Sequence, residues 1–110
     1  MVKLGSLNHA KGFILNKLFE DGRIGGKHLP AHLLARGYPP KYRYLIEPAF
    51  EALKTESPSL IHVENKRTGR STSPHVCMVP SRVRRARPLI NAYRKATKLP
   101  RYGRDMKSLL

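Results

Sequence analysis

Apolar residues recur at intervals of three and four along the first part of the chain. The positions that follow this spacing are Leu7, Ala10, Ile14 and Leu18. This period places them on one face of a helix, so the sequence predicts a helix over about residues 7–20. Ser6 or Asn8 can cap its start, and Gly22 ends it. Residues 23–26 are then expected to form a short extended link, with at most one bridge to the edge of a sheet.

Two further helices are predicted before the pattern changes. The shorter one covers about residues 27–36, with Pro30 in its first turn, where no backbone N–H partner is needed. The longer one covers about residues 40–56 and has the clearest helical stripe of apolar residues in the chain. Pro48 lies inside this stripe and removes one backbone hydrogen bond, so it is expected to kink the helix or to split it.

The period becomes alternating at about residue 60, which is typical of a strand. Ile61 and Val63 share one face, and a second apolar strand over about residues 75–79 can pair with the first, over about 61–64. The polar and basic stretch 65–74 lies between these strands. The pattern therefore predicts a β-hairpin with a long, mobile, cationic loop at its end.

The C-terminal part begins with an arginine-rich run over residues 82–87, which is not assigned to a helix; if it is extended, its side chains would alternate in direction. A helix is predicted over about residues 88–98, and the tail 99–110 is expected to stay loose until a ligand is bound. The predicted core consists of apolar residues from all the earlier elements: Ile14, Leu18, Leu33, Leu45, Ile46, Phe50, Leu53, Ile61 and Val63.

Charge is distributed very unevenly along this chain of 110 residues, which has the length of one domain. Residues 1–64 carry nine Lys and Arg against six Asp and Glu, whereas residues 65–110 carry thirteen against one. A surface that only needs to be soluble would mix the two signs. The excess therefore indicates a polyanionic partner whose phosphates the basic residues neutralise.

A membrane surface is the main alternative partner for this charge. It would require a long amphipathic helix, and residues 82–88 are interrupted by Pro88 and do not predict one. No apolar run approaches the ~20 residues of a membrane span, and the first residues lack the apolar stretch of a secretory signal. A single cysteine, Cys77, suits a reducing compartment. We therefore expect an intracellular, cytoplasmic protein associated with the nucleoid or with ribosomes.

The order of these elements is helix, extended link, helix, tight turn, helix and hairpin. This order resembles the winged helix-turn-helix superfamily over roughly residues 7–80. The resemblance implies that residues 27–36 are the positioning helix, residues 40–56 the recognition helix and residues 65–74 the wing. In that superfamily the recognition helix enters the major groove, and the wing follows the backbone or the minor groove.

The fold class that follows is α+β, mainly α. A winged helix-turn-helix of three helices plus a hairpin wing would occupy residues 1–80, and a basic C-terminal arm and helix would occupy residues 81–110.

Candidate nucleic-acid contacts are basic or aromatic residues outside the apolar stripes. They are Lys41, Arg43 and Tyr44 in the third helix, Lys66, Arg67 and Arg70 in the wing, Arg82, Arg84, Arg85 and Arg87 in the arginine run, and Arg94, Lys95, Lys98 and Arg101 beyond it. Lysine and arginine bind phosphates, and arginine does so with a bidentate fork. The alternatives are an ordinary solvated helix face for the first group and a solvated linker for the arginine run. Most of the affinity is expected from the wing and the arm, not from the third helix.

Metal binding and catalysis find little support in the sequence. His28 and His32 are four residues apart on a predicted helix, and His62, His75 and Cys77 lie on the two predicted strands. Neither set has the surrounding motif of a zinc site, so we predict no metal and no cofactor. Cys77 between two apolar neighbours is expected to be buried and inert. No catalytic residue is predicted, and the chain is not expected to be an enzyme.

The resulting prediction is a monomeric or weakly associating nucleic-acid-binding protein. Duplex DNA in a regulatory or chromatin role is favoured because of the predicted helix order and wing. The first alternative is a structural RNA-binding protein of the ribosome, since small ribosomal proteins with this fold commonly carry basic tails. The second alternative is a protein-interaction adaptor, which would leave the basic half unexplained.

Overall fold

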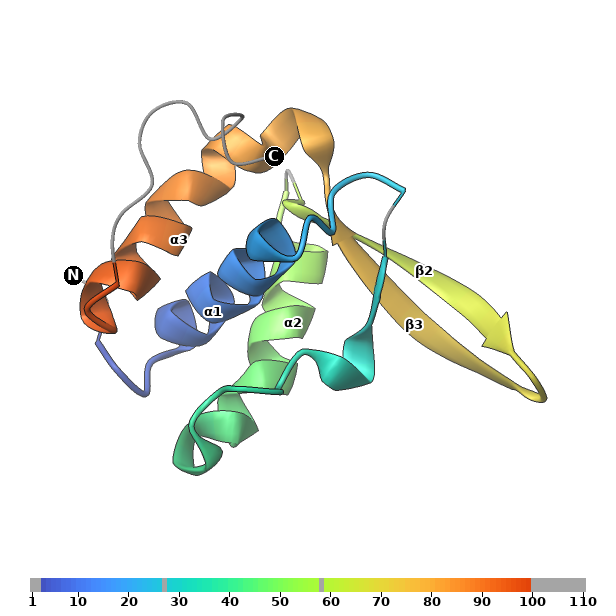
Figure 1. Ribbon diagram of the computed structural model, residues 1–110, viewed down its shortest axis with the longest axis horizontal. Helices are drawn as coiled ribbons and strands as arrows, with labels where there is room; N and C mark the ends of the chain where they lie inside the picture. The colour runs from blue at the N-terminus through green and yellow to red at the C-terminus, as the bar shows by residue number, and fades with distance from the viewer. Residues whose placement is uncertain (1–2, 27, 58, 100–110) are drawn as a thin grey trace.

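The computed structural model describes residues 3–26, 28–57 and 59–99, and within these ranges the protein is α+β. Three α-helices pack beside a sheet of three antiparallel strands (Figure 1). The α-helices, strands and 3-10 helices (η) are, in chain order, α1 (Leu7–Glu20), β1 (Leu29–Pro30), η1 (Ala31–Leu33), η2 (Pro40–Leu45), α2 (Ile46–Thr55), β2 (Ile61–Thr68), β3 (Ser71–Met78), η3 (Pro80–Arg82) and α3 (Val83–Ala96). In the sheet, β3 lies between β1 and β2.

The first helix and the link after it are as the sequence predicts. Ser6 caps α1 by accepting a hydrogen bond from the His9 backbone N–H at 3.2 Å. Gly22 follows the helix with φ of 67°, a conformation that favours glycine. Ile24 then forms one parallel bridge with Met78, which is the single bridge expected for this link.

The predicted helix over residues 27–36 is wrong. Its described part consists of β1 and η1, a two-residue strand followed by one 3-10 turn. Pro30 disfavours the helical conformation for the residue before it, so Leu29 is extended and pairs with Val76 of β3. The proline itself is tolerated because β1 is an edge strand.

The predicted third helix is divided, as expected from its internal proline. The first part, η2, has 3-10 geometry, and the α-helical part α2 begins at Ile46. Pro48 therefore lies in the first turn of α2, where its missing N–H would have no intrahelical partner in any case.

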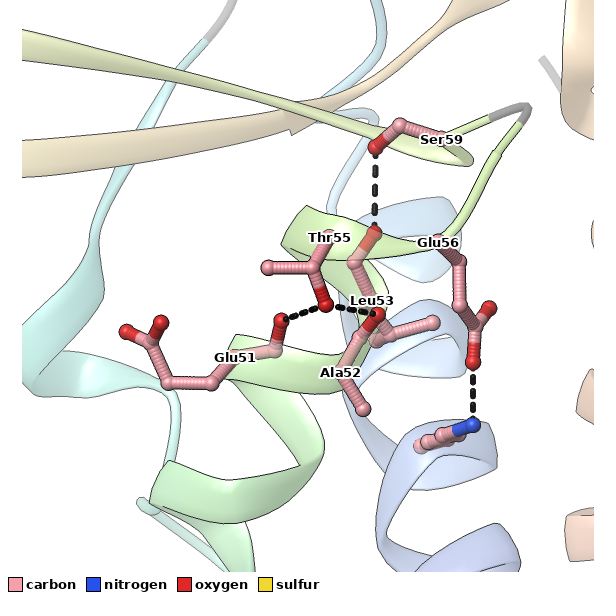
Figure 2. Close-up of polar contacts among 7 residues, drawn as sticks. Glu51, Ala52, Leu53, Thr55, Glu56 and Ser59 are labelled. Atoms are coloured by element: carbon pink, nitrogen blue, oxygen red, sulfur yellow. Dashed lines mark hydrogen bonds and ion pairs between the residues drawn. The ribbon is translucent and has the colours of Figure 1, made fainter.

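Side chains fix the end of α2 and the turn into β2 (Figure 2). Thr55 Oγ1 donates to the carbonyl oxygens of Glu51 and Ala52, at 2.9 and 3.3 Å. Ser59 Oγ donates to the Leu53 carbonyl at 3.0 Å, so an otherwise unpaired carbonyl in the last turn of α2 has a partner. Glu56 pairs with Lys11 of α1, and this ion pair joins the two helices.

The hairpin is longer than predicted, and its expected long loop is wrong. Residues 65–68 of β2 pair with residues 71–74 of β3, from Asn65 opposite Pro74 to Thr68 opposite Ser71. Gly69 and Arg70 alone connect the strands, and Gly69 has the positive φ, 64°, that such a turn requires. Both faces of this outer part are solvated, so its strands lack the apolar alternation by which a strand is recognised in a sequence.

The arginine-rich run is helical, which corrects the prediction that the C-terminal helix begins only at Pro88. Helix α3 begins at Val83, five residues earlier than predicted, and Pro88 lies within it. Its buried residues Val83, Ala86 and Ile90 form a stripe that packs on α1. The sequence predicts no amphipathic helix over residues 82–88, and a membrane surface is disfavoured for that reason. The structure does have an amphipathic helix there, but its apolar face packs on α1. No helix in the described part of the chain is long and apolar enough to cross a membrane.

Helix α1 lies at the centre of the fold, in contact with α2, α3 and β3 (Figure 1). Of the nine predicted core residues, the six that are buried are Ile14, Leu18, Ile46, Phe50, Leu53 and Ile61. The other three, Leu33, Leu45 and Val63, are partly buried against the same core. Residues of α3 belong to this core as well, so α3 is an integral part of the folded unit.

Candidate nucleic-acid interface

The outer end of the hairpin carries three exposed cations, Lys66, Arg67 and Arg70, which we call the hairpin cations. Neighbouring residues of a strand point to opposite faces, so Lys66 and Arg67 supply one positive charge to each face. Ser73 pairs with Lys66 and Thr72 with Arg67, so a hydroxyl accompanies the cation on each side. Cations and small hydroxyls are the groups that bind backbone phosphates.

The hairpin projects from the helical part of the molecule (Figure 1). Because its strands are paired up to Gly69, the projection is an ordered two-stranded ribbon. A two-stranded ribbon can lie along a groove of duplex DNA, or along its backbone, without clashing with the body of the protein.

The outer face of α3 carries Arg84, Arg85 and Lys95, all exposed, which we call the helix cations. Arg84 and Lys95 are eleven residues apart, which brings them to the same side of the helix about 16 Å from each other. Lys98, just beyond the helix, is also exposed, and Arg87 is half-buried at its edge. The predicted contact Arg101 lies outside the described residues.

Two predicted contacts, Arg82 and Arg94, instead donate hydrogen bonds to other residues of the protein. Arg94 is 8% exposed and donates from Nη1 to Asn16 Oδ1 at 2.9 Å and to Glu20 Oε1 at 2.6 Å. Arg82 is half-buried and donates from Nη1 to the Ser59 carbonyl at 2.7 Å. These bonds join α3 to α1 and η3 to the turn before β2, so the two arginines are removed from the binding surface.

The third group of predicted contacts, Lys41, Arg43 and Tyr44, lies on η2, and we call it the η2 group. All three are exposed, and Tyr44 is the most exposed large apolar residue described, at 69%. The ammonium of Lys41 lies over the Tyr42 ring, 5.0 Å from its centroid. Exposed Glu47 and Glu51 follow on α2, so this surface has both signs of charge.

The acidic residues of the described chain lie on α1, on α2 or directly after these helices, except Glu64, which lies on β2 two residues before Lys66. They are Glu20, Asp21, Glu47, Glu51, Glu56 and Glu64, and none occurs from residue 65 to residue 99. Glu20, Glu51 and Glu56 are neutralised by Arg94, Lys54 and Lys11. Within the described ranges, none of the hairpin or helix cations forms a salt bridge. Their positive potential is therefore available to an external anion.

The three groups do not form one continuous patch. The hairpin end and the C-terminal end of α3 lie at opposite ends of the long axis, and η2 projects on another side (Figure 1). The molecule extends 42 Å along this axis. A ligand that contacts both the hairpin cations and Lys95, near the C-terminal end of α3, must therefore itself be extended, as a nucleic-acid duplex is.

The histidines that come together in the structure do not form either of the two sets considered from the sequence. Cys77 is buried, as expected, and burial raises the pKa of its thiol. Among the described residues, the one group with metal-ligand spacing is His28, His62 and Glu64. The sequence could indicate part of this group, because His62 and Glu64 are two residues apart on β2 and therefore lie on the same face of the strand. His28 joins them because the chain at this point leads into β1 and not into a helix.

Comparison of the chain with protein-family models, with curated proteins and with solved structures found no match.

Proposed function

We propose that this protein binds nucleic acid without catalysing a reaction, and that duplex DNA is its ligand. The observation that carries the proposal is the segregation of charge. Six exposed cations on the hairpin and on α3 have no acidic partner in the described chain, and no Asp or Glu occurs from residue 65 to residue 99. Unpaired cations on the projecting hairpin and on the outer face of α3 suit phosphate neutralisation, which supplies most of the affinity in sequence-independent binding.

We further propose that the fold is a variant of the winged helix in which the hairpin, in the place of the wing, makes the main contacts with the nucleic acid. The order of α1, η1, α2 and the hairpin supports this, with β1 pairing beside β3. Only one 3-10 turn, η1, stands where the superfamily has a positioning helix. A short turn gives α2 less support for insertion into a groove.

Charge on α2 also favours contact through the hairpin and α3. Glu47 and Glu51 are exposed on this helix, and like charges facing phosphates would be repelled. The η2 group alone offers base contacts from this side, through Lys41 and Arg43. We therefore expect little sequence preference and an affinity set by phosphate contacts.

Structured RNA is the second candidate, and one observation favours it. Tyr44 is 69% exposed and directly follows Arg43, an arrangement that suits stacking on an unpaired base next to a phosphate contact. Duplex DNA offers no such base, so DNA binding would leave Tyr44 without a role.

Competition binding separates the two candidates. A fluorescent DNA duplex bound to the full chain is displaced by unlabelled duplexes of unrelated sequence and by an RNA stem-loop, at one salt concentration. DNA binding predicts similar displacement by all the DNA duplexes and weaker displacement by the RNA. Stronger displacement by the RNA, reduced by Tyr44→Ala, would make RNA the ligand. Absence of binding to either nucleic acid at low salt would refute the proposed function.

A further inference from the structure

Three potential metal ligands meet over one face of the sheet. His62 and Glu64 come from β2, and His28 comes from the residue directly before β1. One ligand atom of each lies within 4.8 Å of those of the other two. Because β3 separates β1 from β2, the three side chains join the two edge strands across the central strand.

The His28 ring is held in a defined orientation. Its Nδ1 lies 3.1 Å from the Gly26 carbonyl oxygen, to which it can donate only as Nδ1–H. That hydrogen bond leaves the lone pair on Nε2 in the neutral ring. Metal-bound histidines are usually oriented in this way, by a carbonyl or carboxylate on the nitrogen that does not bind the metal.

The remaining nitrogen of His28 is buried and faces the other two ligands. Within the described part of the chain Nε2 has no hydrogen-bond partner, although it lies 3.3 Å from Glu64 Oε2. The His62 ring is 6.0 Å from the His28 ring, centroid to centroid, at an angle of 60°. A buried nitrogen with a free lone pair is costly, and a metal ion would satisfy it.

The donor set determines which cation fits. Two imidazoles and one carboxylate are the nitrogen and oxygen ligands of zinc, whereas Mg²⁺ prefers oxygen ligands and retained water. Bonds of about 2.0–2.2 Å from one Zn²⁺ ion place ligand atoms about 3.5 Å apart. The separation of 3.3 Å between His28 and Glu64 already agrees with this value, and His62 is exposed enough to move.

We propose that His28, His62 and Glu64 bind one Zn²⁺ ion. The ion fastens the segment before β1 to β2, at the base of the projecting hairpin. Three protein ligands leave a fourth position for water, and the exposed side of Glu64 provides the route of entry. The proposal does not depend on nucleic-acid binding, since none of the hairpin cations or helix cations is among the three ligands.

Calorimetric titration of the untagged full chain with Zn²⁺ tests the site. We expect one Zn²⁺ per chain, no binding of Mg²⁺, and a higher melting temperature when zinc is present. His62→Ala and Glu64→Gln change exposed residues, so both variants should fold. Each should weaken zinc binding by at least about tenfold, since loss of even an outer-sphere partner has this effect.

His32→Ala is the matched control, because His32 is exposed and is not one of the three ligands. Its affinity for zinc should equal that of the unchanged chain. Visible absorption of the Co²⁺-substituted protein reports the geometry, and a tetrahedral spectrum that is lost in Glu64→Gln supports the assignment. Zinc binding that is absent from the unchanged chain, or equally strong in both ligand variants, would show that His28 and Glu64 form only an ion pair.

Discussion

Replacing Gly12 by alanine should force α1 and α3 apart. The two helices approach closely at Gly12, since a Cβ built there would lie 2.5 Å from Tyr93 Cβ and 2.6 Å from the Leu89 carbonyl oxygen. Neither neighbour can move away by rotating a flexible side chain, because one is a backbone atom and the other is bonded directly to the backbone. The whole of α3 must therefore shift.

The size of the effect follows from these two distances. Carbon atoms pack at about 3.5–4.0 Å, so the helices must separate by about 1 Å. Forcing an extra carbon into a packed interior costs about 1–3 kcal/mol, and two backbone-linked clashes place this contact near 3 kcal/mol. Alanine returns about 1 kcal/mol through its higher helix propensity. The net loss is about 2 kcal/mol, or a fall of about 10 °C in melting temperature for a domain of this size.

Denaturant unfolding of Gly12→Ala, followed by circular dichroism, measures this loss. Gly26→Ala is the control, since a Cβ at Gly26 meets nothing within 4 Å and its φ is not in the left-handed region. The control should unfold at nearly the concentration required for the unchanged chain. If Gly12→Ala were as stable as the control, or more stable, the close packing of α3 on α1 would be refuted.

Three further predictions concern single residues. Burial lowers the pKa of His9 below 6.5, so the free energy of unfolding should fall as the pH drops through and below this value. Unfolding measured at several pH values should show a smaller fall for His9→Asn than for the unchanged chain. Arg94→Ala should lower the free energy of unfolding by about 2 kcal/mol, because Asn16 loses a buried partner. The affinity of the folded variant for duplex DNA should stay unchanged in anisotropy titrations. Lys98 directly follows Thr97, the C-cap residue of α3, and has φ of 59°, so Lys98→Gly should raise the free energy of unfolding by about 0.5–1 kcal/mol in thermal denaturation.

Elements whose signal is local were predictable from the sequence. The helix over residues 7–20 has both its apolar stripe and its cap within its own residues, and the inner part of the hairpin shows alternation. The helix predicted over residues 27–36 failed because the effect of Pro30 on Leu29 outweighed a weak stripe. The outer hairpin was missed because a strand that is solvated on both faces has no apolar pattern.

The start of α3 was missed for a related reason. Val83 and Ala86 stand among arginines, so their helical spacing with Ile90 was hidden by the charge of the run and by Pro88. The packing of these residues on α1 outweighs the lost hydrogen bond of the proline. This packing also means that deletion of residues 81–110 would remove part of the core, so charge substitutions are the appropriate test of binding.

The candidate contacts were predictable as a class but not one by one. Local charge indicates which elements are basic, and most of the predicted cations in the described ranges are exposed. Arg94 is an exception because its partner Glu20 lies 74 residues earlier in the chain, and no local pattern relates them. The cluster of His28, His62 and Glu64 was missed for the same reason, since it depends on how β1 and β2 flank β3.

The salt dependence of DNA binding tests the central claim most directly. If the three hairpin cations and the three helix cations each neutralise one phosphate, the logarithm of the affinity should fall with the logarithm of salt at a slope of about −5. Removing the hairpin cations, in the triple variant Lys66→Gln, Arg67→Gln and Arg70→Gln, should reduce the slope to about −3.

The matched control is the double variant Lys41→Gln and Arg43→Gln, which removes charge from the η2 group and should leave the slope nearly unchanged. Fluorescence anisotropy over a series of salt concentrations gives all three slopes with the same duplex. A reduced slope for the hairpin variant alone is the predicted result. An unchanged slope for the hairpin variant, together with a reduced slope for the control, would contradict the account and place the interface on η2 and α2.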